Sequence, residues 1–312
     1  RNTASSSTLD RLGFKSEGTN LNLRYQNNTI IADSLFGIKY NLSNFDLNKY
    51  GFNHVTSEKT MGLYQNNNAS QLAILTDGIY NNIDFTVNTL DNQTSLLNTL
   101  SGLNLTYFKR APSQLFDKDA KSLNQRVAKN VSNSNKDFVT ITYQVIAPPH
   151  SQLYVSIPNI SWSDDNNHSL SITVNGVTKN QVTDNTFDFF DLGYFETESM
   201  VTIKLSFPGN KAISFDNPSF YALDTQNYQI AMDTINERDS KVTTSKNKVF
   251  VDYSSKTNAS LFFTIPYDKG WTATINHKKV KIQRAQKGFM KVDVPSGKGK
   301  VVLTFIPYGL KT

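Results

Sequence analysis

The chain has 312 residues, a net charge of +6 and no cysteine, and its 20 Phe and 14 Tyr provide enough apolar mass for packed cores. This composition excludes a disordered chain, and the lack of cysteine excludes disulfides, cysteine-based zinc sites and a thiol nucleophile. No run of about 18 apolar residues occurs, so the sequence predicts no membrane span. It does not open with a signal peptide, and Arg1 is not an initiator, so we expect a fragment or processed form.

Residues 1–135 are predicted to form a small α+β domain. Helices are expected at Ser6–Gly13, Thr29–Phe36 and Thr94–Leu100. Each begins at a Ser or Thr and is followed or closed by a glycine, which are typical helix start and stop signals. Strands are expected at Ile38–Leu42, Met61–Tyr64 and Leu72–Leu75. Residues 112–136 are polar and weakly periodic, so we interpret them as the lead into the next domain.

Two strand-rich modules are predicted to follow, over residues 137–223 and 242–308. Strands of the first are expected at Phe138–Val145, Leu153–Ile157, Leu170–Val174, Phe187–Phe190 and Val201–Phe207. Strands of the second are expected at Val249–Tyr253, Leu261–Ile265, Trp271–Ile275, Val280–Gln283, Phe289–Val294 and Lys300–Ile306. A short helix is expected between the modules, around Ile230–Ile235.

Four landmarks recur in one order at an offset near one hundred residues, which predicts a duplicated module. They are Leu153–Pro158 with Leu261–Pro266, Trp162 with Trp271, Ile172–Gly176 with Thr274–His277, and Val201–Pro208 with Val301–Pro307. Many short antiparallel strands with tight turns favour sandwiches. The expected fold is therefore mainly β, with a small α+β N-terminal part and two tandem antiparallel, jelly-roll-like β-sandwich modules.

Trp162 and Trp271 each follow a proline that ends a strand. One interpretation makes them sugar-stacking platforms. The other makes them core residues, which is the more usual role of a tryptophan that recurs at the same place in two modules.

Basic residues gather in the second module. From Lys269 onward there are ten Lys or Arg and one acid, Asp293. The densest group is predicted to bind polyanions and consists of Lys278, Lys279, Lys281 and Arg284. A solvated, lysine-rich strand edge that blocks aggregation is the alternative. Nucleic acid is not expected as a partner, because no recognition helix or RNP-like aromatic pattern accompanies the charge.

No catalytic or metal-binding motif stands out. The four histidines are scattered without ligand spacing, and no nucleophile elbow, Walker loop or dinucleotide fingerprint occurs. We therefore expect no catalytic residue, no metal and no cofactor in this chain.

Several segments resemble the YfhO family of large bacterial membrane proteins. The most specific are Tyr267–Trp271, Lys278–Val280, Val294–Lys298 and Phe305–Gly309, which resemble the closing block of the family. Leu35–Tyr40, Met61–Asn66 with Gln71–Ala73, and Phe215–Leu223 are also similar to family segments. His277 departs from the pattern, because the family usually has glycine at this turn.

The resemblance implies a large extracytoplasmic domain of a GT-C-type membrane glycosyltransferase in a Gram-positive bacterium. Such a protein is expected to transfer sugar from a polyprenyl-phosphate carrier to teichoic acid or a related wall polymer. Its catalytic carboxylate is expected in an early loop outside this chain. The implied partners are the parent membrane domain and an anionic teichoic acid or glycan. The alternative is a non-enzymatic, carbohydrate-binding or adhesin-like surface protein.

Overall fold

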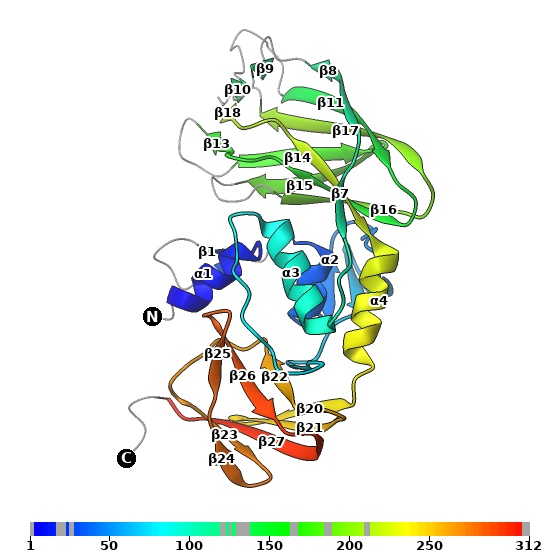
Figure 1. Cartoon of the computed structure of the whole chain (residues 1–312). Coiled ribbons are helices and arrows are strands. Elements are labelled where there is room, and N and C mark those ends of the chain that lie inside the picture. Colours follow the sequence, from blue (N-terminus) through cyan, green and yellow to red (C-terminus); the bar gives the residue numbers. More distant parts are fainter. Residues whose placement is uncertain are drawn as a thin grey trace.

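The computed structural model describes residues 3–16, 23–24, 28–118, 123–124, 127–128, 138–162, 168–183, 189–208 and 213–307. Within these ranges the chain is mainly β, with several antiparallel sheets and few helices. A layer of helices lies in the middle, and one β-sandwich lies at each end of it (Figure 1). No helix among the described residues has the length and hydropathy needed to cross a bilayer.

The helical layer contains α1 (Thr3–Arg11), α2 (Ile30–Leu35), α3 (Thr89–Ser101) and α4 (Thr225–Asn236). The long helices start and stop at residues that satisfy their free backbone groups. The Asn88 side chain accepts hydrogen bonds from the first backbone N–H groups of α3, and Asp224 does the same for α4. Helix α3 ends at Gly102, whose φ of 77° is left-handed and favours glycine.

The first sandwich has a five-stranded sheet in the order β15-β14-β17-β11-β8 and a four-stranded sheet in the order β16-β12-β19-β7. Its strands are β7 (Phe108–Arg110), β8 (Ser113–Lys118), β11 (Phe138–Ala147), β12 (Ser151–Ser156), β14 (His168–Val174), β15 (Val177–Thr183), β16 (Phe189–Phe195), β17 (Ser199–Pro208) and β19 (Ser219–Asp224). A small ribbon of β13 (Ser161–Trp162) and β18 (Ile213–Ser214) adjoins it.

The second sandwich has a five-stranded sheet in the order β20-β21-β27-β23-β24 and a four-stranded sheet in the order β25-β26-β22-β6. Its strands are β6 (Ala73–Leu75), β20 (Ser240–Ser245), β21 (Lys248–Ser255), β22 (Ala259–Phe263), β23 (Trp271–Ile275), β24 (Lys278–Val280), β25 (Gln283–Ala285), β26 (Phe289–Val294) and β27 (Gly297–Phe305).

The two five-stranded sheets have the same strand order, with β8, β11, β14, β15 and β17 matching β20, β21, β23, β24 and β27. In the smaller sheets, β16 and β12 match β26 and β22. The hairpins also match in detail. The Asn175 amide oxygen accepts from Thr202 N at 3.0 Å, and the Asn276 amide oxygen accepts from Lys300 N at 2.9 Å. The structure thus contains two copies of one module.

The tryptophans do not occupy equivalent positions, contrary to the sequence interpretation. Counting back from the paired hairpin asparagines, Trp271 on β23 corresponds to Leu170 on β14. Trp162 instead lies in the small ribbon with β18. The shared position after a proline reflects loops of different length and not a shared place in the sheet.

In each four-stranded sheet one central strand, β12 or β22, is buried on both faces. One face packs inside its sandwich, and the other contacts the helical layer through Tyr154 of β12 and Phe262 of β22. Both strands are buried along their whole length, as expected for strands without a solvent face. The interior therefore consists of three apolar cores, one in the helical layer and one in each sandwich, and the two smaller sheets lie between them.

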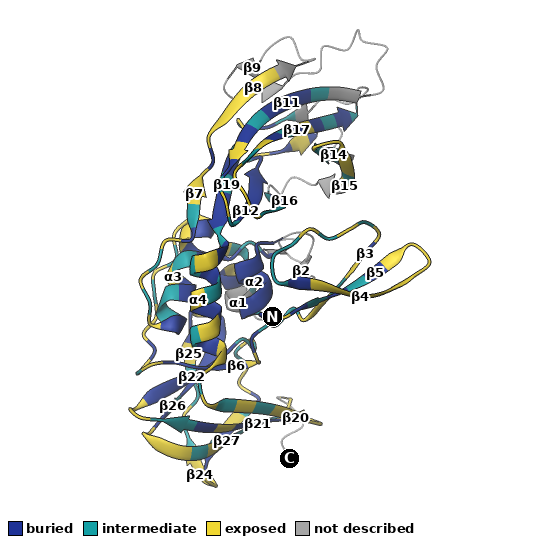
Figure 2. Ribbon diagram, turned by 90° about the vertical axis from the view of Figure 1, so that its right-hand side faces the viewer, coloured by how far each residue is buried: buried dark blue, intermediate teal, exposed yellow. Residues whose placement is uncertain are grey.

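The sheets cross the expected boundary near residue 135. Strands β7 and β8 belong to the first sandwich and β6 to the second, so residues 1–135 do not form a separate domain in the structure. The same segment also forms an arm of β3 (Tyr40–Ser43), β4 (Phe52–Glu58) and β5 (Met61–Asn66), which projects from the body (Figure 2). Two further two-stranded pairs are β1 (Lys15–Ser16) with β2 (Leu23–Arg24) and β9 (Leu123–Asn124) with β10 (Val127–Ala128).

Candidate functional site

The predicted polyanion-binding residues lie at one edge of the second sandwich. Lys278 and Lys279 are exposed on β24, the last strand of the five-stranded sheet. The turn before them has φ of 48° at Asn276 and 70° at His277, the two left-handed residues that a tight hairpin requires. This turn fixes the strand and directs the two lysines to solvent.

Lys281 and Arg284 follow on a different path from the expected one. The predicted strand Val280–Gln283 is interrupted, because the chain passes from β24 in one sheet to β25 in the other. Val280 and Ile282 pack against the core, and Lys281 is exposed between them. The Arg284 guanidinium lies 4.3 Å from the centre of the Tyr267 ring, a cation–π distance. Lys278 and Lys279 thus lie on one sheet, Arg284 on the other, and Lys281 on the connection between them.

Cross-strand register brings further lysines to the outer face of the five-stranded sheet. One row runs from Lys279 through Thr274, Val302 and Phe250. The adjacent row holds Lys300, Asp252 and Lys241, and Lys248 is also exposed on β21. Asp252 contacts Lys300 at 3.6 Å.

Sequence reasoning missed Lys241 and Lys248, because it confined the basic group to residues after 269. The alternation of strand residues was the available signal. The result is a Thr- and Lys-rich face suited to an extended polyanion. We call this face, together with the four basic residues beside it in sequence, the cationic face; it comprises Lys241, Lys248, Lys278, Lys279, Lys281, Arg284 and Lys300.

The tryptophans differ in accessibility. Trp162 is 2% exposed and packs edge-on to Phe207 at 6.3 Å, so its ring faces are inaccessible to a sugar in this structure, in agreement with the core alternative. Trp271 is half-buried beside Phe305, with ring centres 5.0 Å apart. The structure does not bring the two tryptophans together, and sugar stacking by Trp271 stays a prediction.

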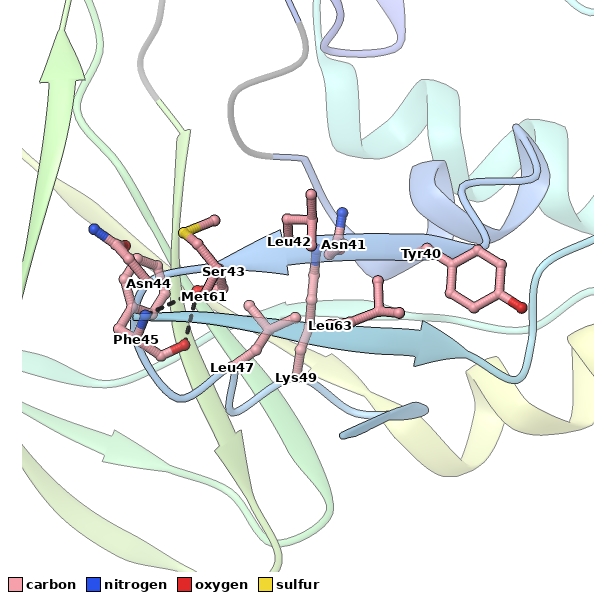
Figure 3. Close-up of a pocket in the computed structure, with 10 residues that line it drawn as sticks. All are labelled: Tyr40, Asn41, Leu42, Ser43, Asn44, Phe45, Leu47, Lys49, Met61 and Leu63. Carbon is pink, nitrogen blue, oxygen red and sulfur yellow. Dashed lines mark hydrogen bonds between the residues drawn. The ribbon is translucent and has the colours of Figure 1, made fainter. Parts of the chain in front are cut away.

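An apolar cleft of about 690 Å³ runs along the arm (Figure 3). Tyr40, Leu42, Met61 and Leu63 alternate along β3 and β5 and share one face. Leu42 is 70% exposed and Tyr40 51%. The sequence predicts these strands, and their alternation was the available signal for this apolar face. The cleft can accept an apolar group.

A buried charged cluster joins the first sandwich to the helical layer. The Lys49 ammonium donates a hydrogen bond to the buried Asp33 carboxylate. Nearby Asp191 accepts from Gln152 Nε2 at 2.7 Å and Gly193 N at 2.8 Å, while its buried Oδ2 has no hydrogen-bond partner. Burial raises the pKa of Asp191, and Lys49 offsets part of this rise. The cluster is positioned as a structural junction.

Metal ligands do not gather in the described part of the chain, where no group of three or more His, Asp or Glu side chains could hold an ion. The surfaces found are therefore binding surfaces: a cationic face, an apolar cleft and a half-buried tryptophan.

Comparisons with known proteins identify the family. The family described as "Bacterial membrane protein YfhO" matches residues 1–312. The chain belongs to the YfhO family. The YfhO protein of Bacillus subtilis (strain 168) is 26% identical over 115 residues, which are 34% of this chain and 13% of that protein. The matched region is thus a small part of a much longer relative.

Similarity to solved structures is weak. A cycloisomaltooligosaccharide glucanotransferase from Paenibacillus sp. has a TM-score of 0.25 at 7% identity, covering 68% of this chain and 50% of that one. A conserved protein of unknown function from Pseudomonas aeruginosa PAO1 has a TM-score of 0.16 at 10% identity, covering 64% of this chain and 90% of that one. Scores this low carry no functional argument.

Proposed function

We propose that this YfhO family chain is the extracytoplasmic accessory domain of a polytopic membrane glycosyltransferase. The full-length protein would transfer sugar from a polyprenyl-phosphate carrier to teichoic acid or a related cell-wall polymer of a Gram-positive bacterium. The observation that carries this proposal is the match of a bacterial membrane protein family to residues 1–312. The catalytic carboxylate is assigned to the membrane part of the protein, outside this chain.

The cationic face gives the domain its role in this proposal, which is to hold an anionic acceptor polymer over the membrane-embedded site. Lys278, Lys279 and Lys281 are exposed, so each contact with a phosphate group contributes at most about 1 kcal/mol. Several weak contacts along a repeating polymer add up, and salt screens them. Such binding suits an acceptor that must move on after modification.

The experiment uses the full-length protein in its membrane. Removal of residues 1–312 is expected to abolish sugar modification of the wall polymer, measured by NMR of purified polymer, while the membrane part stays at normal abundance. Unchanged glycosylation would contradict the accessory role. It would favour the alternative of a carbohydrate-binding or adhesin-like surface protein, particularly if the chain 1–312 then bound glycans by itself.

A second experiment tests the cationic face. Binding of polyglycerolphosphate to chain 1–312 is expected to weaken about fivefold for each of Lys279→Glu and Lys281→Glu, and to weaken further as salt rises. Lys204→Glu is the matched control, because Lys204 is exposed on the outer face of the equivalent sheet in the first sandwich. If binding changes neither with salt concentration nor with the two substitutions, the role proposed for this face is contradicted.

A further inference from the structure

A second groove, of about 670 Å³, separates the base of the arm from β20 of the second sandwich. Polar side chains dominate its walls, in contrast to the apolar cleft of the arm. Those that the argument uses are Lys39, Gln65, Asn67, Ser70, Gln71 and Thr244. Part of its lining belongs to the segments that resemble the family, Leu35–Tyr40, Met61–Asn66 and Gln71–Ala73, but the resemblance assigns none of these residues a binding role.

Hydrogen bonds hold the groove in a fixed shape. The Gln71 side chain donates to Ser240 O at 3.0 Å and accepts from Val242 N at 2.7 Å, as a neighbouring strand would. This joins β20 to the segment after the arm. On the other side, Asn66 donates to Ser34 Oγ and Ile38 O, both at 3.1 Å. A preformed polar groove binds ligand without first paying to order its walls.

Ser70 is the unusual residue of the groove. It is 7% exposed, and its buried Oγ has no hydrogen-bond partner. Its backbone is held in place, since Ser70 N donates to Ser34 O at 2.8 Å. A buried hydroxyl left unpaired costs stability, so it requires an explanation in a native structure. A ligand hydroxyl in the groove provides one.

Other polar groups in the groove are uncommitted. Gln65, Asn67 and Thr244 form no side-chain hydrogen bond with the described residues, although amide and hydroxyl groups both donate and accept. Lys39 adds one positive charge. Tyr40, which pairs with Gln65 across β3 and β5, lines the apolar cleft of the arm and not this groove, and the Lys39 ammonium lies 5.9 Å from its ring centre.

We propose that this polar groove binds the vicinal hydroxyl groups of a sugar or a polyol unit. Gln65 and Asn67 would pair with ring hydroxyls, and Ser70 would accept or donate at the floor. Lys39 would meet a phosphate where the unit carries one. The inference rests on the proposed function in one respect: the unit would be part of the acceptor or donor glycan.

Saturation-transfer NMR on chain 1–312 tests the groove, with D-glucose, N-acetyl-D-glucosamine and sn-glycerol 3-phosphate as three separate probes. Transfer to at least one probe is expected. Ser70→Ala should weaken it about fivefold. Neutral sugars alone would identify a sugar ring as the ligand, and glycerol phosphate alone, lost in Lys39→Ala, would identify a polyol phosphate chain. No transfer to any probe would overturn the proposal.

Thermal unfolding distinguishes a binding role of Ser70 from a structural one. Ser70→Ala removes an unpaired hydroxyl, so stability should stay the same or rise. The matched control is Ser151→Ala, because Ser151 is also buried but its Oγ donates to Pro148 O at 2.6 Å. That control should lower stability and leave probe binding unchanged. Lower stability with unchanged binding in Ser70→Ala would overturn the role of Ser70.

The experiments can contradict the groove proposal and the accessory role independently of each other. Intact glycosylation after removal of residues 1–312, together with sugar binding lost in Ser70→Ala, would contradict only the accessory role. Loss of glycosylation without binding of any probe would contradict only the groove.

Discussion

The two sandwiches share one strand order, but they obtain the third strand of the smaller sheet from different places. In the first sandwich β19 pairs with β12 and follows the rest of the module in sequence. In the second, β6 takes the corresponding place beside β22 and comes from the N-terminal segment. The first sandwich is therefore nearly continuous in sequence, whereas the second needs a strand from between α2 and α3 of the helical layer. The pairing of Leu75 with Leu261 spans most of the chain.

The sandwiches also place opposite charges at the same position. Asp191 of β16 pairs with Tyr154, and Lys291 of β26 pairs with Phe262, so both face the helical layer. The Lys291 ammonium donates to Tyr80 O at 2.8 Å and to Asp293 at 3.0 Å. The Asp191 carboxyl has one unpartnered oxygen. The duplicated framework thus tolerates either charge, provided that the helical layer supplies suitable neighbours.

The largest expected effect comes from the borrowed strand. Leu75→Ala leaves a cavity in the second sandwich and should cost about 2–4 kcal/mol. The chain has two tryptophans, one in each sandwich, so Trp271 fluorescence in a Trp162→Phe background reports the second sandwich. Leu75→Ala should lower the urea midpoint of this Trp271 signal. The same substitution in a Trp271→Phe background should lower the midpoint of the Trp162 signal less. Equal shifts would mean that both sandwiches unfold as one unit.

A smaller effect is expected at the buried lysine. Asp293→Asn removes the carboxylate beside the Lys291 ammonium, which is 9% exposed. Loss of one partner of a buried pair is costly, but Asp293 is partly exposed, so about 2 kcal/mol is expected from urea unfolding followed by Trp271 fluorescence. Lys291→Met, which removes the charge itself, should cost less. A greater loss from Lys291→Met would contradict this account.

The matched hairpins allow a reciprocal pair of substitutions, and each is expected to change stability by a smaller amount. His277 has φ of 70°, and Gly176 has φ of 89° at the equivalent place. His277→Gly should stabilise the second sandwich by about 0.5–1 kcal/mol, because glycine adopts left-handed φ without strain. Gly176→His should destabilise the first sandwich by a similar amount, since a Cβ there meets no atom within 4 Å and only backbone strain acts. Each of the two substitutions is made in the Trp162→Phe and in the Trp271→Phe background, and thermal unfolding of these four variants measures both effects.

The smallest expected effect is an opposite pH dependence of the two sandwiches. Burial by itself raises the pKa of Asp293, but hydrogen bonds from Ser260, Lys291 and Gln283 outweigh it and lower this pKa. The stability that Asp293 gives to the second sandwich is therefore present above the ordinary carboxyl pKa and is lost as pH falls through the lowered value.

For Asp191 the sign is reversed. Burial is the largest cause of its raised pKa, and Lys49 and Lys179 offset it in part. Its contribution to the first sandwich is present below the ordinary carboxyl pKa and is lost as pH rises through the raised value. Urea midpoints across the acidic range, read from Trp162 and Trp271 separately, check this. Asp191→Asn should flatten the Trp162 profile alone, and a change confined to Trp271 would contradict the assignment.

Much of the local structure could be predicted from sequence. Helix α3 was expected from the spacing of Thr94–Leu100 and its glycine stop, and the structure extends it at the N-terminal end to Thr89 because Asn88 caps it. The turn of the β14–β15 hairpin is formed by Asn175–Gly176, a pair that favours tight hairpins from sequence alone. The basic residues of β24 were also found, because charged residues can be identified from the sequence directly. These features depend on neighbours in sequence, which is why pattern alone reveals them.

Other features depend on contacts between residues that are far apart in the sequence, and the sequence pattern does not reveal such contacts. The interruption between β24 and β25 arises because Val280 and Ile282 join the core while the chain changes sheets. Trp162 and Trp271 share a sequence context but not a place in the fold. The polar groove could not be expected either, because Gln71 and Thr244 are brought together only by the pairing of Gln71 with β20.

The amino-acid sequence by itself determined the β-rich class, the duplicated strand pattern, the basic C-terminal segment and the resemblance to the YfhO family. Alternation, turn residues and charge are local properties, so they persist in the unfolded chain. Only the tertiary structure decided which strand completes each small sheet, which lysines share a face, and which hydroxyl is left unpaired in the groove. A strand edge accepts any compatible partner, and its choice is made by the apolar surfaces that the collapsed chain buries together.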